Sequence, residues 1–406
     1  MAFQGLIGLA GLPALAWLLS EARWQVNWRT VVAGMALQLV LALLLLKLPG
    51  ASGFFLLLND AVEALQKATD TGTGFVFGYL GGAPLPFAET RPGASFILAF
   101  KALPLVLTIS ALASLLFHWG VLQRIVSAFA FILRHSMGIG GALGFAAAVH
   151  VFVGMIEAPL LVRPYLIRMS RGELFAMMTC GMAGVAGTMM ALYANILGPV
   201  IPNALGNILI ASLISTPAAL AVGALMVPFA PADDESFALD DKLRSDGALD
   251  AIVKGTGDGV GLLVNIVAML LVLVALVTLA NMAIAPLTLQ GVLGAVFAPV
   301  MWALGMPWSE AVTAGNLMGS KTVLNEFIAY LDLAALPDGA LSAHSRLIVT
   351  YALCGFANFG SLGIVIGGLG AMVPERRPEI VALGGRSILA GTFATCMSGA
   401  TVGLIL

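Results

Sequence analysis

The sequence predicts an all-α polytopic membrane protein with about eight transmembrane helices and two re-entrant hairpins. Of its 406 residues, 60% are hydrophobic and only 10% are charged, whereas a soluble globular chain carries roughly a quarter charged residues. The mean hydropathy of +1.01 leaves too few polar side chains to cover a water-exposed surface. Long apolar stretches also recur from end to end. The chain therefore has lipid as its main solvent.

Eight stretches are long enough to cross a bilayer, which takes about 20 apolar residues each. They are residues 5–20, 30–48, 95–117, 173–197, 203–229, 257–285, 345–372 and 380–406. Two further stretches, 139–168 and 292–330, carry glycine, proline and ionised residues near their middle. Because broken backbone inside a bilayer is tolerated only beside protein or a water-filled cavity, we predict that these two form re-entrant hairpins.

The connections between the spans predict how the chain is organised. Residues 54–69 and 120–135 are typical of helices at the membrane surface, and the Asp-rich segment 231–250 is predicted to be an aqueous loop between two halves. The apolar N-terminus is interpreted as a retained first helix, because no cationic segment precedes it. Short connections rich in arginine are predicted to face the cytoplasm, and eight crossings from an outside N-terminus would return the C-terminus outside. These arginines are Arg23, Arg29, Arg163, Arg168, Arg171, Arg376, Arg377 and Arg386.

Several function classes are disfavoured by the composition. The net charge is -2 and no run of Lys or Arg occurs, so nucleic-acid binding is not predicted. The three cysteines and four histidines lack the spacing of metal ligands, and no motif of a hydrolase or an ATP-driven pump is present. We therefore expect no enzyme activity and no metal or organic cofactor.

An internal repeat is indicated, as in many secondary transporters. Segments 154–165 and 319–330 both run from Gly to Tyr, and segments 180–184 and 354–358 both begin with Cys-Gly. The offsets between these pairs are 165 and 174 residues, whereas aligning the two hairpin glutamates gives 169, which fits neither. Each half is predicted to contain a hairpin followed by a broken helix.

Two acidic residues within the interrupted segments, Glu157 and Glu326, are the sharpest candidates for chemistry. An acid at membrane depth costs about 3 kcal/mol on insertion scales and usually lines a pathway or binds a partner. The alternative is a structural ion pair with a nearby cation such as Arg163 or Lys321. Both positions favour a functional role, because they lie in broken segments rather than at the ends of spans.

A second polar cluster lies in the glycine-punctuated interval 355–363, which contains Phe356, Asn358 and Ser361. Glycine permits unwinding, and freed backbone groups can coordinate an ion or substrate; the alternative is ordinary packing between membrane helices. The equivalent interval 181–188 offers little beyond backbone carbonyls. His150 can titrate near neutral pH, and a structural hydrogen bond is the alternative role.

These motifs resemble those of the concentrative nucleoside transporter family. The resemblance is carried by segments 151–164, 321–330, 352–358, 367–370 and 374–377. It implies a homotrimer in a bacterial inner membrane, in which a moving transport part carries a nucleoside together with a cation past a static scaffold, as an elevator. It also implies a division into scaffold and surface helices (1–135), a first transport repeat (136–230), the loop and a long scaffold helix (231–290), and a second transport repeat (291–406).

The resemblance assigns roles to five residues that match the family pattern. Glu326, Asn358 and Ser361 fall on positions that bind the ribose hydroxyls, Phe356 falls on a position that lines the site, and Glu157 falls near the nucleobase. The ribose assignment agrees with elementary chemistry, since a sugar diol offers donors that a carboxylate accepts strongly.

The first hairpin departs from the family pattern. Met155 and Ile156 stand where family members commonly have an amide and a hydroxyl that contact the base, and neither can read a base edge by hydrogen bonding. We therefore expect a ligand with a ribose-like polar end and a less polar, or differently presented, other end.

The sodium site of the family also loses its side-chain ligands. His150 replaces an asparagine and Gly184 replaces a serine, which leaves the neighbouring backbone carbonyls near Val153 and Val185. Because a hard cation prefers oxygen donors, we predict that sodium coupling is absent or weak. Proton coupling through Glu157, Glu326 or His150 is the substitute, and uncoupled facilitation is the alternative.

Two other functions stay open from the sequence. One is a divergent family member that carries another small metabolite, and the other is a receptor or channel that does not transport. An intramembrane enzyme is disfavoured, because no nucleophile–base pair is present.

Overall fold

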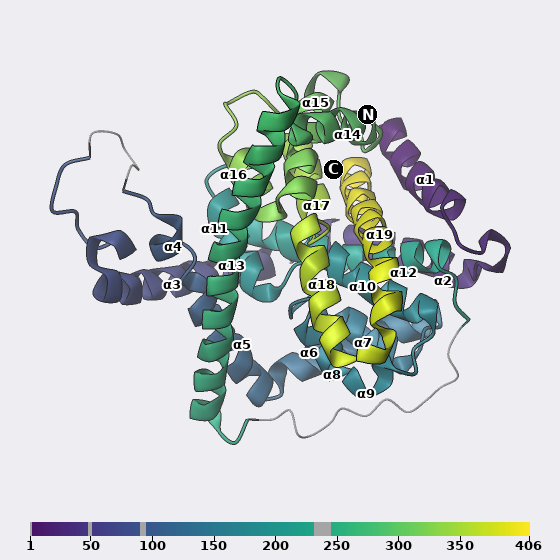
Figure 1. Ribbon diagram of the computed structural model, residues 1–406, viewed down its shortest axis with the longest axis horizontal. Helices are drawn as coiled ribbons and strands as arrows, with labels where there is room; N and C mark the ends of the chain where they lie inside the picture. The colour runs from purple at the N-terminus through teal and green to yellow at the C-terminus, as the bar shows by residue number, and fades with distance from the viewer. Residues whose placement is uncertain (1, 48–50, 90–94, 231–244) are drawn as a thin grey trace.

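The computed structural model describes residues 2–47, 51–89, 95–230 and 245–406, and every regular element among them is a helix (Figure 1). The first half contains α1 (Ala2–Leu18), η1 (Arg23–Gln25), α2 (Trp28–Lys47), α3 (Ala51–Phe77), η2 (Gly78–Gly81), α4 (Leu98–Lys101), α5 (Leu105–His118), α6 (Val121–Met137), α7 (Gly141–Val149), α8 (Glu157–Leu161), α9 (Arg163–Leu166), α10 (Arg171–Ala183), α11 (Gly187–Leu197) and α12 (Ala204–Met226). The second half contains α13 (Ala248–Ile284), α14 (Leu289–Ala303), α15 (Trp308–Val323), α16 (Glu326–Ala334), α17 (Ala343–Leu353), α18 (Phe359–Met372), η4 (Pro374–Arg376) and α19 (Arg377–Ile405).

The predicted polytopic membrane architecture is confirmed. Among the described residues, six helical stretches are long and apolar enough to cross a bilayer, and three shorter apolar helices accompany them. Each of the eight predicted spans overlaps one of these nine stretches. The long helix α13 begins at Ala248, earlier than the predicted residue 257. Most of the predicted loop 231–250 lies outside the described residues, which resume at residue 245.

Two of the predicted spans are broken in the middle. The span 173–197 consists of α10 and α11, and the span 345–372 consists of α17 and α18. The two breaks meet, because the backbone N–H of Phe356 donates to the carbonyl oxygen of Gly184 at 3.2 Å. A side chain at Gly355 has no room, since a Cβ there would lie 2.9 Å from the carbonyl oxygen of Met182. Glycine therefore lets the two interrupted helices cross closely.

The hairpin prediction holds for the first half and needs correction in the second. Residues 139–168 form α7, a turn over 150–156, and the short helices α8 and α9. The segment 292–330 instead contains three helices, because Gly305 adopts a φ of +114° and reverses the chain between α14 and α15. The hairpin that carries Glu326 is therefore α15–α16, and α14 is a separate helix packed against α15.

The repeat register predicted from the Gly–Tyr and Cys-Gly motifs is wrong. Glu157 is the first residue of α8 and Glu326 is the first residue of α16, which sets an offset of 169 residues. Helices α10 and α17, which precede the two breaks, begin at Arg171 and Ala343, an offset of 172, and end at Ala183 and Leu353, an offset of 170. These helices therefore lie 169–172 residues apart, between the two offsets of the motifs. The motif match failed because glycine and alanine recur so often in an apolar chain.

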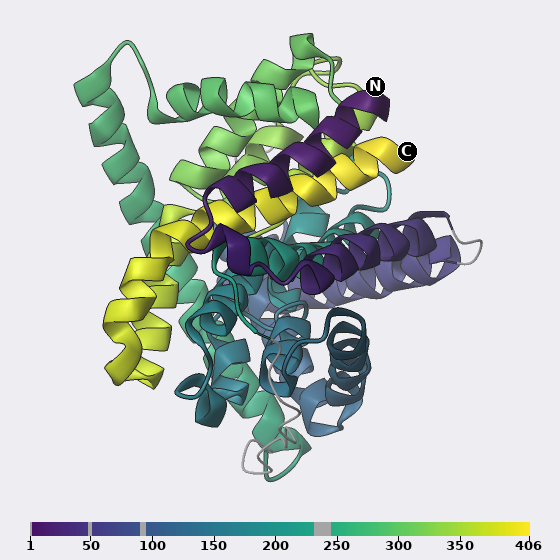
Figure 2. The ribbon, with the colours of Figure 1, turned by 90° about the vertical axis from the view of Figure 1, so that its right-hand side faces the viewer.

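Long helices pack in pairs on different sides of the molecule. Helices α5 and α13 pack along one another on one side of the molecule, while α2 packs on α12 and α1 runs beside α19 (Figures 1 and 2). The predicted surface helix 54–69 is part of the longer α3, and the segment 120–135 corresponds to α6. The α5–α13 pair faces the two hairpins, and this arrangement positions the site.

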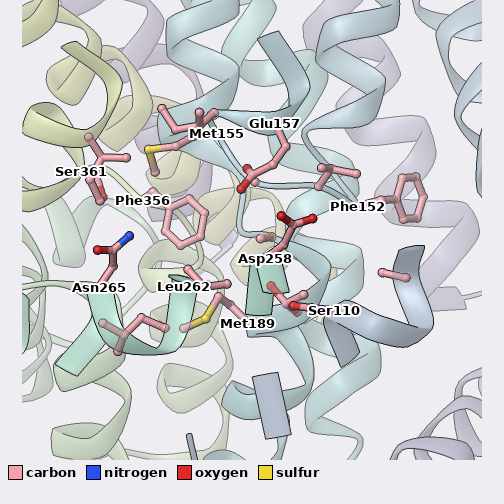
Figure 3. Close-up of a pocket in the computed structure, with 18 of the residues that line it drawn as sticks. Ser110, Phe152, Met155, Glu157, Met189, Asp258, Leu262, Asn265, Phe356 and Ser361 are labelled. Carbon is pink, nitrogen blue, oxygen red and sulfur yellow. The ribbon is translucent and has the colours of Figure 1, made fainter. Parts of the chain in front are cut away.

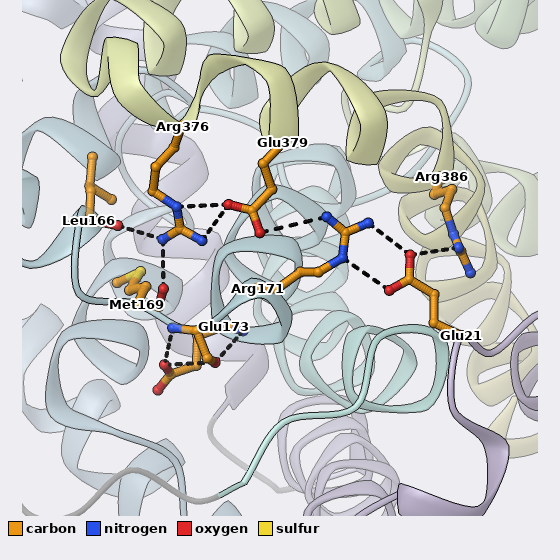
Figure 4. A network of polar contacts seen from close by, with 9 residues as sticks. Glu21, Leu166, Met169, Arg171, Glu173, Arg376, Glu379 and Arg386 are labelled. Atoms are coloured by element: carbon orange, nitrogen blue, oxygen red, sulfur yellow. Dashed lines mark hydrogen bonds and ion pairs between the residues drawn. The ribbon is translucent and has the colours of Figure 1, made fainter.

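An ionic network joins connections that the arginine pattern predicted to share one side of the membrane (Figure 4). The carboxylate of Glu21, which follows α1, accepts hydrogen bonds from Arg171 at 2.9 and 3.0 Å and from Arg386 at 2.8 Å. Arg376 donates to the carbonyl oxygens of Leu166 and Met169, after the first hairpin, at 2.8 and 2.6 Å. The network ties α1, α10 and α19 together at one end of the molecule.

The contacts of Glu21 with Arg171 and Arg386 lead us to expect that the protein loses stability in acid. The hydrogen bond from Arg171 lowers the pKa of this carboxyl below its usual value of 4.5. A depressed folded-state pKa stabilises the protein above the unfolded-state pKa, and this contribution disappears as the pH falls through the folded value, below about pH 4.5. We expect Glu21→Gln to cost about 1 kcal/mol or less at pH 7 and to shrink the drop in melting temperature between pH 7 and pH 4. The matched variant Glu375→Gln alters an exposed glutamate outside the network and should leave that drop unchanged; equal drops in all three proteins would contradict the assignment.

Candidate functional site

The site is centred on the buried carboxylate of Glu326, which opens α16. The hydroxyl of Tyr193 on α11 donates to Oε1 at 2.6 Å, and the side-chain amide of Asn358 donates to Oε2 at 2.9 Å. A carboxylate offers about four acceptor positions, so these two donors fix its orientation and leave capacity for further donors. The three residues come from α11, α16 and the break before α18. Their spacing in the sequence did not predict that they would meet.

The side chain of Asn358 makes two hydrogen bonds at this break. Its Oδ1 accepts from the backbone N–H of Ser361 at 2.7 Å and so caps the N-terminus of α18, a role that asparagine fills well. Its amide nitrogen faces Glu326. Asn325 caps α16 in the same way, by accepting from the backbone N–H of Ile328 at 2.9 Å. Both helix starts are thereby held in place beside the carboxylate.

A cavity of about 440 Å³ lies in front of this cluster, a size that suits a small organic molecule. It is bounded by the first hairpin, the second hairpin, the break before α18, and the α5–α13 pair (Figure 3). Eight residues predicted for substrate or ion binding line it: Val153, Met155, Ile156, Glu157, Glu326, Phe356, Asn358 and Ser361.

Helices α5 and α13 contribute polar residues that the sequence reasoning missed. Ser110, Asp258 and Asn265 line the cavity opposite Phe356 and the first hairpin (Figure 3). Asn265 lies within the apolar part of α13 and Asp258 lies at the start of that part, and this position of polar residues at an apolar stretch was the available signal. Tyr193 was missed because its hydroxyl contacts Glu326 across 133 residues of sequence.

The first hairpin presents one carboxylate and an apolar surface to the cavity. Glu157 folds back over Gly154, where any Cβ would collide with its carboxylate. Met155 is buried, and Ile156 packs against Gly368 of α18, at a position where a Cβ would overlap Ile156. The two apolar residues therefore hold the hairpin against α18 as well as lining the cavity.

The remaining ion-coupling candidates lie behind the hairpin. His150, Gly184 and Val185 are buried and do not line the cavity. Nδ1 of His150 contacts the carbonyl oxygen of Ala146 at 2.7 Å, so Nδ1 carries the hydrogen. Its Nε2 lies 3.1 Å from the point that a Cβ at Gly181 on α10 would occupy. The imidazole thus fills the space between the first hairpin and the helix before the break.

Neither acid forms the structural ion pair considered from the sequence. Among the ion pairs of the described residues, none joins Glu157 to Arg163 or Glu326 to Lys321. The fully buried Lys321 donates instead to the carbonyl oxygen of Ala352 at 2.9 Å and to Thr395 Oγ1 at 3.2 Å. It therefore ties the second hairpin to the end of α17.

Family models match almost the whole chain. The model for the N-terminus of the "Na+ dependent nucleoside transporter" matches residues 7–80, a "Nucleoside recognition" model matches residues 99–200, and the model for the transporter C-terminus matches residues 207–403. An uncharacterized transporter of Bacillus subtilis, YutK, is 34% identical over 99% of both chains. The chain belongs to the concentrative nucleoside transporter family. It is thus a multi-pass membrane transporter and not an enzyme.

Relatives with a stated function and solved structures point to the same family. The nucleoside permease NupC of Helicobacter pylori is 32% identical, with 98% of this chain and 97% of the permease covered. A structure of CNTnw in an inward-facing, substrate-bound state superposes with a TM-score of 0.90 at 35% identity, covering 99% of this chain and 98% of that one. An outward-facing CNTnw variant also gives a TM-score of 0.90, at 34% identity. The similarity to the concentrative nucleoside transporter fold therefore covers 99% of the chain.

Proposed function

We propose that this chain is a nucleoside importer that couples uptake to protons rather than sodium, and that it works as an elevator within a homotrimer in a bacterial inner membrane. The observation that carries the proposal is the buried Glu326 carboxylate, oriented by Tyr193 and Asn358 at the wall of a cavity of nucleoside size. The relatives of known function transport nucleosides, which supports the same substrate class.

The ribose end of the substrate fits the second-half cluster. The 2′- and 3′-hydroxyls are adjacent donors, and a carboxylate accepts hydrogen bonds about twice as strongly as a neutral group. Asn358 and Ser361 stand beside Glu326 in the cavity wall. A site built around such polar groups rejects analogues that lack the hydroxyls, because its buried groups are then left unpaired. Phe356 also lines the cavity, where its ring can stack on the planar base of the nucleoside.

The coupling proposal rests on the environment of His150. Its imidazole occupies the space beside Gly181, and Gly184 brings no side-chain oxygen there. Sodium, a hard cation, binds best to oxygen donors, and an imidazole Nε2 beside carbonyl groups is a poor substitute for them. Proton coupling needs no such cage of oxygen donors, and His150, Glu157 and Glu326 are the proposed carriers.

Restoring the sodium ligands is a direct test of this proposal. The double variant His150→Asn/Gly184→Ser should acquire sodium-stimulated uptake, with an increase of about tenfold or more under a sodium gradient. The serine fits, because a Cβ at Gly184 would meet only ordinary contacts of 3.4–3.5 Å. Gly198→Ser, on the same chain but away from the hairpin, serves as the control. Strong sodium stimulation of the unmodified protein would contradict the proposal.

The elevator and trimer proposals are supported by the separation of α5 and α13 from the hairpins. These two helices line the cavity from one side, and the two hairpins line it from the other. Helix α13 exposes a long apolar surface that includes Leu271, Leu279 and Met282, which suits contact with lipid or with a second copy. A cross-link between α13 and the first hairpin that blocks uptake reversibly would support relative movement of the two parts.

Counterflow in proteoliposomes tests the substrate class without assuming any driving ion. Vesicles loaded with unlabelled nucleoside should accumulate labelled cytidine, uridine or adenosine transiently, and 2′,3′-dideoxy analogues should compete poorly. Uptake of another metabolite with no nucleoside competition would favour a divergent carrier. Nucleoside binding without any flux would favour a receptor, and both results would overturn the proposal.

A further inference from the structure

We infer that Asp258 on α13 and Glu157 on the first hairpin form an acid pair that reads an exocyclic amino group of the base. The transporter should therefore prefer cytidine and adenosine to uridine and inosine. This inference rests on the proposed nucleoside function and names a specificity determinant of the same site. It adds Asp258, a residue of the α5–α13 side, to the residues that contact the substrate.

The two acids line the same cavity from its two sides, Asp258 from α13 and Glu157 from the first hairpin. Figure 3 shows their carboxylates turned toward the same part of it. Within the described parts of the chain, neither forms an ion pair. Lys254, one turn before Asp258 on α13, binds Asp250 at 2.7 Å instead. Asp258 itself stands where the polar first part of α13 gives way to its apolar part, and its carboxylate lines the cavity there.

The charged residues of the cavity restrict the chemical groups that a ligand can present to it. Three of its described lining residues are acidic, Glu157, Asp258 and Glu326, and no arginine or lysine lines it among the residues that the structure describes. Glu326 is occupied by Tyr193 and Asn358 and is assigned to the ribose. Two carboxylates therefore remain for the base, where Met155 and Ile156 supply no donor or acceptor.

An exocyclic amino group matches such a pair. It carries two hydrogens, so it can donate one to each carboxylate, and hydrogen bonds to charged acceptors are the stronger kind. Uridine and inosine carry a carbonyl oxygen at the same place on the base. The lone pairs of that carbonyl oxygen would face two carboxylates, which are also acceptors, and would find no hydrogen-bond donor. Leaving polar groups unpaired lowers affinity, and this penalty is how the site would reject uridine and inosine.

The test compares bases that differ only in this group. In purified protein and in counterflow, we expect cytidine to bind at least about tenfold more tightly than uridine, and adenosine more tightly than inosine. Asp258→Asn, whose amide both donates and accepts, should reduce each ratio to about threefold or less. The variant Asp258→Glu keeps the carboxylate and should retain most of the preference. Asp250→Asn makes the same change on the same helix outside the cavity and should leave the ratios unaltered.

The outcomes separate this inference from the proposed function. Uptake of all four nucleosides with equal affinity would overturn the acid pair while leaving nucleoside transport intact. Unchanged ratios in Asp258→Asn would also overturn it, provided that this variant still discriminates against 2′,3′-dideoxyuridine and is therefore folded at the ribose end. Absence of binding and uptake for every nucleoside would instead refute the proposed function itself.

Discussion

Glu326→Gln should lower nucleoside affinity by about 100-fold or more and abolish uptake at micromolar substrate. The carboxylate accepts from Tyr193 and Asn358 and is proposed to accept from the ribose as well. A glutamine would turn its own NH₂ group toward one of these donors. Each hydrogen bond to a charged group contributes about 1.5–3 kcal/mol. Loss of the ribose contact, together with loss of the fixed position of Asn358, therefore accounts for an affinity about 100-fold lower.

The control for Glu326→Gln is Glu63→Gln, which makes the same change at an exposed glutamate that pairs with Lys67. It should bind nucleosides normally. Discrimination between uridine and 2′,3′-dideoxyuridine reports on the ribose contact itself: the unmodified protein should discriminate strongly, and residual binding to Glu326→Gln should not. Near-normal affinity in Glu326→Gln would contradict the assigned role.

Gly355→Ala should destabilise the protein by about 1–3 kcal/mol, the range for overpacking a close contact, and reduce uptake severely. The added Cβ would lie 2.7 Å from Cγ2 of Thr395 and 2.9–3.0 Å from the carbonyl oxygens of Met182 and Ala183. The break before α18 would have to move away from the break after α10. Asn358, three residues later, would then lose its place beside Glu326.

A matched substitution exists on the adjoining helix. A Cβ added at Gly363 of α18 would meet no atom within 4 Å, so Gly363→Ala should retain the melting temperature and uptake of the unmodified protein. Melting in detergent and counterflow uptake measure the two effects separately. A Gly355→Ala protein with unchanged melting and uptake would show that the contact between the breaks is dispensable.

Much of the fold followed from the sequence, because the membrane imposes strict lengths. The apolar stretches predicted the spans, and glycines within them indicated the first hairpin and the two breaks, together with polar residues in the second break. The separation of α14 from α15 was missed, since it depends on the single backbone reversal at Gly305. The register of the repeat was also missed, because small residues match by chance, whereas the helix boundaries lie 169–172 residues apart.

The candidate site was predictable where its residues are neighbours in sequence. Phe356, Asn358 and Ser361 share one broken interval, and the family pattern joined them to Glu326. Tyr193, Asp258 and Asn265 were not predictable in this way, because periodicity places a residue on a helix face and does not say which distant helix it meets. His150 was singled out, and the structure adds that it lies outside the cavity.

Uptake under separately imposed gradients tests the central claim most directly. Proteoliposomes of the purified protein would receive labelled cytidine under an inward proton gradient without sodium, and under an inward sodium gradient at equal pH on both sides. We predict accumulation above equilibrium with the proton gradient alone and no accumulation with the sodium gradient alone. Concentrative uptake driven by sodium at constant pH would contradict it.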